Sequence, residues 1–339
     1  MQVYWHDGSV TDTVGSERVV AGLGFFDGVH LGHQAILLRV KELAEKMDAL
    51  SVMVTFDRHP LEIIRPDAVP KLLTSARERR TYVWELGIAA MAELGFNQQL
   101  ARLEPKEFAS RILARQLGVI AVVAGDDFRF GYRGQGGVSL LRQAGPGWGI
   151  EATDVVEPIS IKGARVSSTG IRGLLREGKV EEAAECLGRP YRLSGPVIAG
   201  EGRGRKLGFP TANLAVPTER LIPRDGVYAV TVRLIDERSD TGNTCVANQA
   251  RMIGVLSIGD KPTFAGTERS IEAHVLDRQE SYYGKELEVS FCNWLRPSQR
   301  FESSEALKDQ VERDIKIVRR LLGPTPSAMG GKIYSHRAL

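Results

Sequence analysis

The hydrophobic positions in the first half of the chain fall into two patterns. Continuous apolar runs rich in β-branched residues predict buried strands at 19–21, 49–56 and 119–124. Apolar residues at helical spacing predict helices at 35–47, 74–86, 104–117, 171–177 and 180–187. Strands that alternate with helices favour a parallel, doubly wound α/β sheet with right-handed crossovers. Such a sheet binds its ligand at the carboxyl ends of its strands.

Three of these helices carry further expectations. Helix 74–86 is expected to place Arg77, Arg79 and Arg80 on its surface. Helix 104–117 is expected to begin near Pro105, because proline suits the first helical turn. Helix 180–187 is expected to end at Gly188, because glycine is a favoured helix stop.

From about Arg189 the pattern changes, and strand-like runs follow one another without long helices between them. The runs lie at 194–199, 226–234, 252–258, 270–276 and 287–294. This succession predicts an antiparallel barrel or sandwich. Residues 236–248 have no apolar period and are expected to form a surface loop.

A single helix, Ser304–Leu322, is expected to close the second half of the chain. Its predicted buried stripe consists of Leu307, Val311, Ile315, Val318 and Leu322. Gly323 and Pro324 would end the helix, and the residues beyond them are expected to form a loose tail.

Composition narrows the functional classes. The chain of 339 residues is long enough for two domains, and its net charge of +3 makes no global electrostatic case for a nucleic-acid or membrane partner. Cys186, Cys245 and Cys292 fit neither a disulfide framework nor a zinc pattern, which suggests a reducing compartment. The first ten residues lack the features of a signal peptide, and no apolar run is long enough to span a membrane. We therefore expect a cytoplasmic protein.

The stretch 22–34, GLGFFDGVHLGHQ, follows the first apolar run and precedes the first helix. Backbone N–H groups at a helix start lack partners and face an anion favourably, and glycines let the backbone approach a ligand. His30 and His33 are three residues apart and would share one face of the helical turn. The pattern predicts a site for nucleotide phosphate. A glycine-rich turn with two plain surface histidines is the alternative.

Three further turns accompany this one. Residues 57–60 and 126–131 follow the next two predicted strands, so we expect both at the same sheet edge. Residues 167–172, SSTGIR, begin a short helix through a hydroxyl cap. Arg172, in the first turn of that helix, opposes the helix dipole and could bind phosphate oxygens. A surface salt bridge is the alternative for Arg172.

In the second half, glycines alternate with cations over 200–208 and lead into FPTAN. Thr211 and Asn213 would point to the same face of an extended strand, and their oxygens suit Mg²⁺. The cationic loop could cover the phosphates of a nucleotide, although it lacks the Walker pattern. A basic surface turn before an edge strand is the alternative.

Residues 270–275, SIEAHV, place Glu272 and His274 on the face opposite three apolar residues. A carboxylate that faces a phosphate site could accept a proton from an attacking hydroxyl. A solvated outer face of a sheet produces the same alternation.

Taken together, these motifs resemble the bacterial bifunctional riboflavin kinase/FMN adenylyltransferase (FAD synthetase) family. The resemblance spans about residues 19–322 in family order. In the first half it rests on FDGVHLGHQ (26–34), VTFDRHP (54–60), GDDFRFG (125–131) and SSTGIR (167–172). In the second half it rests on LGRPYRLSG (187–195), GRGRKLGFPTANL (202–214), GVYAV (226–230), SIGDKPTF (257–264), IEAHVLD (271–277) and YYGKELEV (282–289).

The resemblance implies two reactions on two domains. A Rossmann-like nucleotidyltransferase domain at 1–186 would transfer AMP from ATP to FMN, which gives FAD and pyrophosphate. A β-barrel domain at 187–322 would phosphorylate riboflavin to FMN with ATP, and 323–339 would be the tail. Riboflavin, FMN, FAD and ATP would be the partners, with Mg²⁺ as the metal. Both reactions are in-line transfers that depend on positioning and preorganised charge.

The resemblance also implies roles for residues. His30 and His33 would steady charge on the phosphates, Arg172 would hold the leaving pyrophosphate, and Glu272 would be the kinase base, with Thr211 and Asn213 as metal ligands. In the first domain the nucleotide- and flavin-binding residues would be Gly24, Phe26, Asp27, Gly28, Pro60, Asp126, Asp127, Ser167, Ser168 and Thr169. In the second domain they would be Gly202, Arg203, Gly204, Arg205, Lys206, Gly208 and Pro210.

Three positions depart from the family pattern. The family often has asparagine where Phe25 stands, an acidic residue near Gly137, and asparagine in place of Ser257. Phe25 and Gly137 leave open a riboflavin kinase with weak or lost adenylyltransferase activity. A non-enzymatic alternative is a flavin or nucleotide sensor, or an RNA-binding protein that uses Arg203, Arg205 and Lys206, although the near-neutral charge speaks against a large nucleic-acid footprint.

Overall fold

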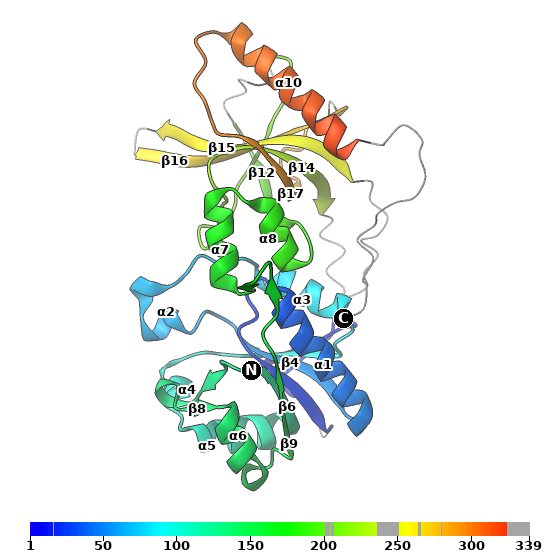
Figure 1. Ribbon diagram of the computed structural model, residues 1–339, viewed down its shortest axis with the longest axis vertical. Helices are drawn as coiled ribbons and strands as arrows, with labels where there is room; N and C mark the ends of the chain where they lie inside the picture. Colours follow the sequence, from blue (N-terminus) through cyan, green and yellow to red (C-terminus); the bar gives the residue numbers. More distant parts are fainter. Residues whose placement is uncertain are drawn as a thin grey trace. The chain divides into compact units, whose positions relative to one another are not determined.

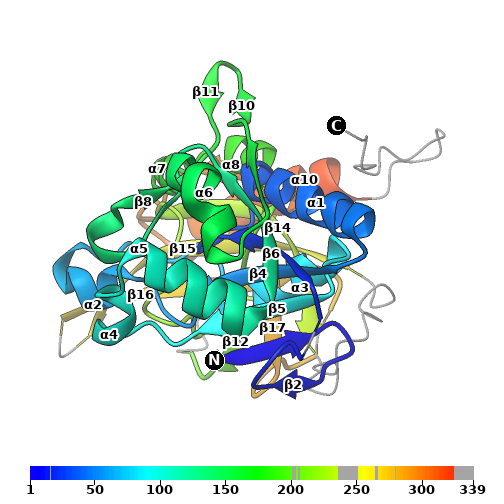
Figure 2. The same ribbon diagram turned by 90° about the horizontal axis from the view of Figure 1, so that it is seen from below.

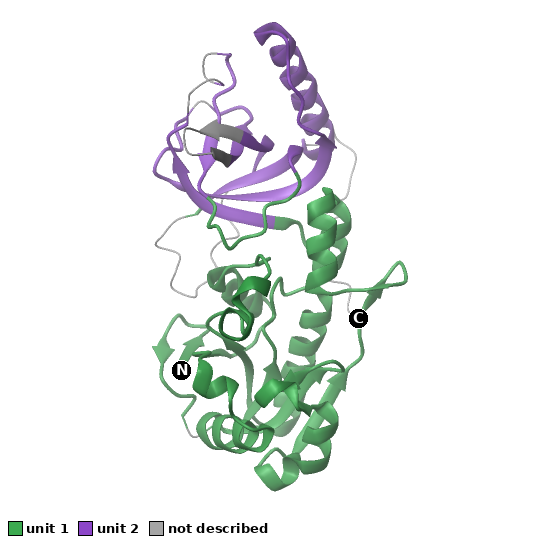
Figure 3. Ribbon diagram, turned by 90° about the vertical axis from the view of Figure 1, so that its left-hand side faces the viewer, with its two compact units in different colours: residues 1–191, 216–224, 235–249 green, residues 192–215, 225–234, 250–339 purple. Residues whose placement is uncertain are grey.

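A computed structural model describes residues 1–15, 17–200, 204, 207–235, 251–263, 266–278 and 280–323. The chain forms two compact units, shown in two colours in Figure 3. Unit 1 comprises Met1–Tyr191, Val216–Arg224 and Ile235–Gln249, and unit 2 comprises Arg192–Ala215, Asp225–Leu234 and Ala250–Leu339. None of the helices in the described part of the chain is both long and apolar enough to cross a bilayer.

The described strands of unit 1 form a seven-stranded sheet in the order β2-β1-β5-β4-β3-β6-β9. Figure 1 labels three of them, β4, β6 and β9. Its strands are β1 (Gln2–Trp5), β2 (Val10–Thr11), β3 (Val19–Leu23), β4 (Leu50–Phe56), β5 (Ala90–Leu94), β6 (Val119–Gly125) and β9 (Ala152–Val156). Strands β5, β4, β3, β6 and β9 pair in parallel, and β1 joins β5 antiparallel. The strand order reverses between β3 and β6, which confirms the doubly wound α/β prediction and puts the ligand edge at their carboxyl ends.

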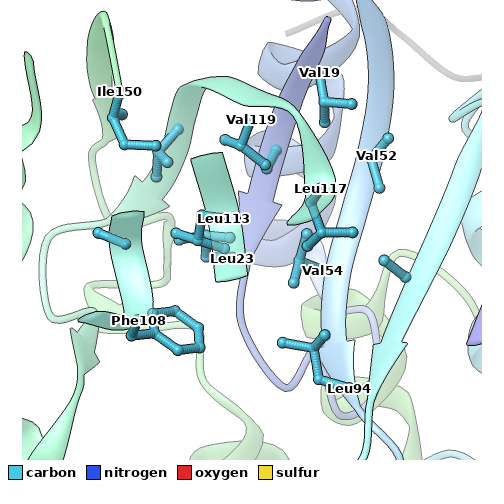
Figure 4. Packing of buried hydrophobic residues seen from close by; sticks show 14 of the residues in the cluster. Val19, Leu23, Val52, Val54, Leu94, Phe108, Leu113, Leu117, Val119 and Ile150 are labelled. Atoms are coloured by element: carbon cyan, nitrogen blue, oxygen red, sulfur yellow. The ribbon is translucent and has the colours of Figure 1, made fainter. Parts of the chain in front are cut away.

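Helices cover both faces of this sheet. On one face α1 (Leu31–Met47) and α3 (Ala76–Glu85) pack their apolar side chains against Val20, Met53 and Met91. On the other face the π-helix η2 (Phe108–Gln116) and α6 (Val138–Ala144) pack against Val19, Val52 and Val54 (Figure 4). Neighbouring residues of a strand thus face different clusters, which explains why the strands read as continuous apolar runs.

The remaining elements of unit 1 are short. They are α2 (Leu61–Ile64), η1 (Pro66–Ala68), α4 (Gln98–Ala101), α5 (Pro105–Glu107), β7 (Arg129–Phe130), η3 (Tyr132–Gly134), β8 (Gly136–Gly137), η4 (Gly145–Trp148), β10 (Ser160–Ile161), β11 (Ala164–Arg165), α7 (Ser168–Glu177) and α8 (Val180–Leu187). Strands β10 and β11 form a hairpin that stands out from the rest of the unit in Figure 2. Helix α8 ends at Gly188 in the left-handed conformation, as predicted.

Three expectations for the first half were wrong or incomplete. Strands β1, β5 and β9 of the sheet were missed, and the sequence of β5, AMAEL, contains weak strand formers. Arg79 is buried rather than on the surface of α3, and its guanidinium lies over the Phe25 ring and 3.8 Å from Glu93. Helix α7 begins at Ser168, earlier than expected, so Arg172 lies in the second turn and not in the first.

Unit 2 contains a closed barrel in the strand order β12-β13-β16-β15-β14-β17. Its strands are β12 (Tyr191–Ile198), β13 (Ala212–Leu214), β14 (Gly226–Ile235), β15 (Met252–Thr263), β16 (Gly266–Val275) and β17 (Glu286–Arg296). The antiparallel-barrel prediction is confirmed. β13 is not among the five predicted strand-like runs, because it is only three residues long, although an extended strand was expected around Thr211 and Asn213.

Helix α10 (Ser304–Leu322) has the predicted bounds. Of its predicted stripe, Val318 is fully buried and the other members are half-buried. The helix also buries Asp314, whose carboxylate accepts hydrogen bonds from the Arg296 guanidinium. The expected loop at 236–248 and the tail from 324 lie outside the described residues.

Candidate functional site

The predicted residues gather in two places, one in each unit. We call the residues around the turn between β3 and α1 the histidine site, and those around β13 and β16 the barrel site. Each is described by itself.

The histidine site begins with a backbone turn of unusual conformation. Phe26, Gly28 and Val29 all have positive φ angles, of 56°, 87° and 39°. Residues with side chains rarely adopt this conformation, and it is typical of functional turns. The turn delivers His30 as the N-cap of α1, where its Nδ1 accepts a hydrogen bond from the backbone N–H of His33 at 3.3 Å.

The two imidazoles stack on each other with their ring centroids 3.6 Å apart, as the three-residue spacing predicted. Burial lowers the pKa of His30 from its usual 6.5 to about 4, and the nearby Arg189 guanidinium adds to the shift. Burial also lowers the pKa of His33, and the neighbouring His30 adds to it. The pair is therefore neutral near pH 7 in the absence of an anion. The buried Nδ1 of His33 has no hydrogen-bond partner among the described residues.

The buried Asp27 carboxylate fixes the turn to residues 73 and 74 by hydrogen bonds. It is 3% exposed and accepts hydrogen bonds from the backbone N–H groups of Leu73 and Thr74, at 2.9 and 3.0 Å. The Thr74 hydroxyl in turn accepts a hydrogen bond from the N–H of Gly28 at 2.9 Å. These contacts make Asp27 a positioning group of the turn, and a carboxylate so occupied presents little free surface to a ligand.

Two arginines hold this turn in place. Arg172 pairs with Asp27 at 2.5 Å through Nη2 and donates from Nε to the carbonyl of Lys71. Arg189 donates to the carbonyls of Gly28 and Val29, at 2.6 and 3.0 Å, with its guanidinium over the Tyr82 ring. Arg189 was missed as a site residue, because its motif LGRPYRLSG was attributed to the second domain. The structure places it in unit 1.

The other predicted turns lie around the same edge. Asp126 and Asp127 follow β6 and pair with Arg165 of the hairpin at 2.7 and 2.9 Å. Arg165 is close enough to His30 to lower its pKa. His59 has a pKa that is lowered by burial first and then by Arg172, so the 57–60 turn with Pro60 also lies near the site.

Ser167 caps α7, and the Ser168 hydroxyl donates to the carbonyl of Asp27 at 2.8 Å. Thr169 lies in the first turn of α7 and Gly24 directly follows β3.

The Phe25 departure also lies in this site. Its ring contacts His59 edge-on, with the ring centroids 4.8 Å apart, and its other contact is the Arg79 guanidinium. The Phe25 carbonyl accepts a hydrogen bond from the Thr55 hydroxyl at 3.2 Å. Gly137, the second departure, is buried in β8 opposite Arg129.

The barrel site is built on three neighbouring strands. Asn213 of β13 lies directly opposite Glu272 of β16, which in turn lies opposite Ser257 of β15. Residues in register share one face, so these three side chains stand on the same side of the sheet. The Thr211 hydroxyl donates to the Glu272 carboxylate at 3.1 Å, and Ser270 donates to its other oxygen at 3.0 Å. Hydroxyl, amide and carboxylate oxygens thus converge on one place.

Two glycines lie directly over these side chains. A Cβ atom added at Gly200 would overlap the Asn213 side chain. One added at Gly204 would overlap the Phe209 carbonyl and come 3.3 Å from the Thr211 hydroxyl. This close approach explains the glycines physically and agrees with a segment that covers the site. Gly202, Arg203, Arg205 and Lys206 lie outside the described residues, whereas Gly208 is described, with φ at 89°.

His274 has a local role in the same site. Its Nδ1 lies 2.9 Å from the carbonyl of Pro210, and its ring contacts that of Phe209 edge-on. It therefore ties the FPTAN segment to β16, and it stands on the Glu272 face, as the alternation predicted.

Comparisons with known proteins agree with this arrangement. The family model of FAD synthetase matches residues 13–170, and that of riboflavin kinase matches residues 187–322. A Pseudomonas fluorescens protein named bifunctional riboflavin kinase/FMN adenylyltransferase is 40% identical over 90% of this chain and 94% of its own length. A protein of that name from Escherichia coli K12 is 36% identical over 92% of this chain and 95% of its own.

A solved structure has a similar fold over most of the chain. It is titled a macrolide-efflux protein from Streptococcus pneumoniae, has a TM-score of 0.79 and is 29% identical. The match covers 91% of this chain and 96% of that one.

Proposed function

This chain belongs to the bifunctional riboflavin kinase/FMN adenylyltransferases, and we propose that its histidine site adenylylates FMN and its barrel site phosphorylates riboflavin. Both activities follow from the two family matches and the full-length relatives, and ATP is the co-substrate. The family matches also support assigning 1–186 to the adenylyltransferase domain and 187–322 to the kinase domain, with 323–339 as a tail.

The observation that carries the first assignment is the neutral, stacked imidazole pair at the start of α1. In adenylyl transfer an FMN phosphate oxygen attacks the α-phosphorus of ATP, and the bond to the pyrophosphate breaks. Negative charge grows on the leaving oxygens, and the imidazole N–H groups and the start of α1 can stabilise it. A bound polyphosphate would raise the depressed pKa values of the two histidines, because an anion favours the charged imidazole.

Arg172 remains the proposed contact for pyrophosphate. Its Nε and Nη2 are used by Lys71 and Asp27, and its Nη1 is the nitrogen that neither contact uses. The turn itself would help to bind the nucleotide through the shape of its backbone rather than through free side chains. Its residues are Gly24, Phe26, Asp27 and Gly28. Asp126 and Asp127 would help to bind the flavin or the nucleotide. Their carboxylates pair with Arg165, so a ligand would first have to replace this ion pair.

The barrel site fits the second reaction. Glu272 would accept the proton of the riboflavin 5′-hydroxyl while that oxygen attacks the γ-phosphorus of ATP and the bond from this phosphorus to ADP breaks. Thr211 and Asn213 supply the hard oxygen donors that Mg²⁺ prefers, and Glu272 lies beside them. A bound Mg²⁺ would neutralise phosphate charge, and these two residues are the ones we propose to hold it. Gly202–Gly208 and Pro210 would enclose the nucleotide.

The two matches do not favour a chain with a lost adenylyl activity. Phe25 and Gly137 depart from the family pattern, yet the FAD synthetase match extends over both. Adenylylation is therefore expected in the wild-type chain.

Two single variants test the assignment. Purified chain is incubated with riboflavin, ATP and Mg²⁺, and FMN and FAD are separated by chromatography. His30→Ala should lower FAD formation from FMN by about 100-fold, the usual scale for losing one charge-stabilising donor, and leave FMN formation unchanged. Glu272→Ala should lower FMN formation from riboflavin, because the base is lost, and should leave FAD formation from FMN unchanged. Each variant is the matched control of the other, and equal loss of both activities in either one would contradict two separate sites.

A further inference from the structure

One segment of the kinase family match belongs structurally to unit 1. Residues Val216–Arg224 lie between β13 and β14 of unit 2 in the sequence, yet they are part of unit 1. The riboflavin kinase match includes them, whereas the FAD synthetase match ends at residue 170. We call Val216–Arg224 the returning segment.

The returning segment pairs with residues 71–73 through backbone and side-chain contacts. Leu72 donates from its N–H to the Glu219 carbonyl at 2.7 Å and accepts from the N–H of Leu221 at 2.9 Å, as in a parallel bridge. The Lys71 ammonium donates to the Thr218 carbonyl at 2.6 Å. The pairing fixes the register of the two stretches.

Arg220 is the centre of this pairing. Its side chain is 2% exposed, pairs with Glu78 at 2.7 Å and donates to the carbonyl of Leu73 at 3.0 Å. The same Glu78 oxygen accepts from the N–H of Ser75 at 2.7 Å in the capping box of α3. One guanidinium therefore clamps both ends of the 73–78 stretch. A buried pair of this kind gains from geometry rather than from charge alone.

The stretch that Arg220 clamps is the one that builds the histidine site. Leu73 and Thr74 present the N–H groups that bind Asp27, and the Thr74 hydroxyl holds the N–H of Gly28. Gly28 lies two residues before His30. The contacts thus run without a break from Arg220, through Leu73 and Thr74, to the turn that delivers the imidazole.

We propose that Arg220 is a positioning residue for adenylyl transfer, supplied by the part of the sequence that matches riboflavin kinase. This inference rests on the proposed role of the histidine site. Arg220 touches no reacting atom; it holds the 71–74 stretch so that Asp27 and Gly28 set the place of His30. Misplacement of a reacting group by about 1 Å can cost about 100-fold in rate. The adenylyl site is therefore incomplete without a segment from beyond β13.

The test uses the full-length chain with two substitutions at one position. Arg220→Met removes both contacts at similar length, and Arg220→Lys keeps a cation but loses the fork that reaches Glu78 and Leu73 together. Arg39→Met is the matched control, because Arg39 forms an ion pair with Asp154 at 2.6 Å elsewhere in unit 1, with its side chain 37% exposed. For each variant kcat and KM are measured for FMN adenylylation, riboflavin phosphorylation is measured on the same sample, and Tm is recorded.

Arg220→Met should lower the adenylylation kcat by about 10- to 100-fold, with KM for ATP and FMN changed far less, because the reacting geometry is lost rather than binding. The adenylylation kcat of Arg220→Lys should lie between those of Arg220→Met and wild type, and the kcat of Arg39→Met should match that of wild type. Phosphorylation should be unchanged in all three variants.

Three results would overturn the inference. One is an Arg220→Lys kcat equal to that of wild type, and another is an equal loss of phosphorylation and adenylylation, which would mean only a loss of folded protein. The third is a lower Tm with normal adenylylation kcat. A wild-type chain that makes no FAD from FMN would instead refute the proposed function, and the inference with it.

Discussion

At the scale of single residues, burial controls the chemistry of the histidine site. An imidazole in water is partly charged near neutral pH, but His30 lies 6% exposed, and three arginines, Arg189, Arg165 and Arg172, act on it. Both effects disfavour the imidazolium. A bound polyphosphate would oppose both effects, because its negative charge favours the imidazolium.

This environment predicts a measurable pH dependence. The folded chain should bind a proton at His30 only near pH 4, whereas the unfolded chain binds it near 6.5. Stability is then fully present above pH 6.5 and is lost as the pH falls, by about 2 kcal/mol at pH 5. NMR titration of the ligand-free chain should show this pKa. His30→Gln should lose less stability than wild type between pH 7 and 5.

A His30 imidazole that titrates near 6.5 in the folded chain would contradict this prediction. So would a wild-type chain and a His30→Gln variant with the same dependence of Tm on pH.

At the scale of elements, the glycine-rich segment before β13 shows how close packing limits the sequence. Gly204 leaves no space for a side chain, because a Cβ would overlap the Phe209 carbonyl and press on Thr211. Backbone atoms cannot yield as a flexible side chain can. The backbone at Gly204 and the stretch from Phe209 to Thr211 must therefore move apart if Gly204 is replaced.

Gly204→Ala should accordingly lower riboflavin phosphorylation by about 10-fold or more, since Thr211 is displaced from Glu272. FMN adenylylation should be unchanged. Gly173→Ala is the matched control: it adds the same methyl group where nothing lies within 4 Å, in the middle of α7. Both activities are measured by product chromatography, and unaltered phosphorylation in Gly204→Ala would refute the packing argument.

Elements also show where sequence patterns succeed. The bounds of α10 and the existence of β3, β4, β6, α1 and α8 followed from apolar periodicity, because those elements bury one face or both. The periodicity could not show Arg79 and Asp314 as buried, since a charged residue is buried only where a partner from another element meets it. It also could not show β13, because a strand of three residues is too short to have a period of its own.

At the scale of the whole molecule, the two activities act in succession on the flavin, and we propose a separate site for each. FMN is the product of one and the substrate of the other. The described contacts of the histidine site lie within unit 1, and those of the barrel site lie within unit 2. Each site should therefore work when the other is disabled.

Mixing two disabled chains tests this independence. His30→Ala makes FMN but little FAD, and Glu272→Ala makes FAD only when FMN is supplied. An equimolar mixture with riboflavin, ATP and Mg²⁺ should form FAD after a lag, because FMN released by one chain reaches the other through solution. Each variant alone is the control. A mixture that accumulates FMN without forming FAD would contradict the prediction.

The sequence by itself determined the two fold types, the order of the longest elements and the motifs that carry the chemistry. These depend on local spacing: apolar periodicity for the strands and helices, glycines for close approach, and paired histidines, hydroxyl and amide for the ligands. The separation of His30 and His33, or of Thr211 and Asn213, is short enough for one turn or one strand to set their relation.

The tertiary structure decided which distant residues complete each site. Arg189 and Arg220 read in the sequence as parts of the second domain, and they lie in unit 1 against Val29 and Glu78. Asp27 was expected to bind the nucleotide or the flavin, and Arg172 was expected to bind phosphate or to form a surface salt bridge. In the structure the two side chains form a buried ion pair. Contacts between residues more than a hundred positions apart arise from packing, and local periodicity carries no information about them.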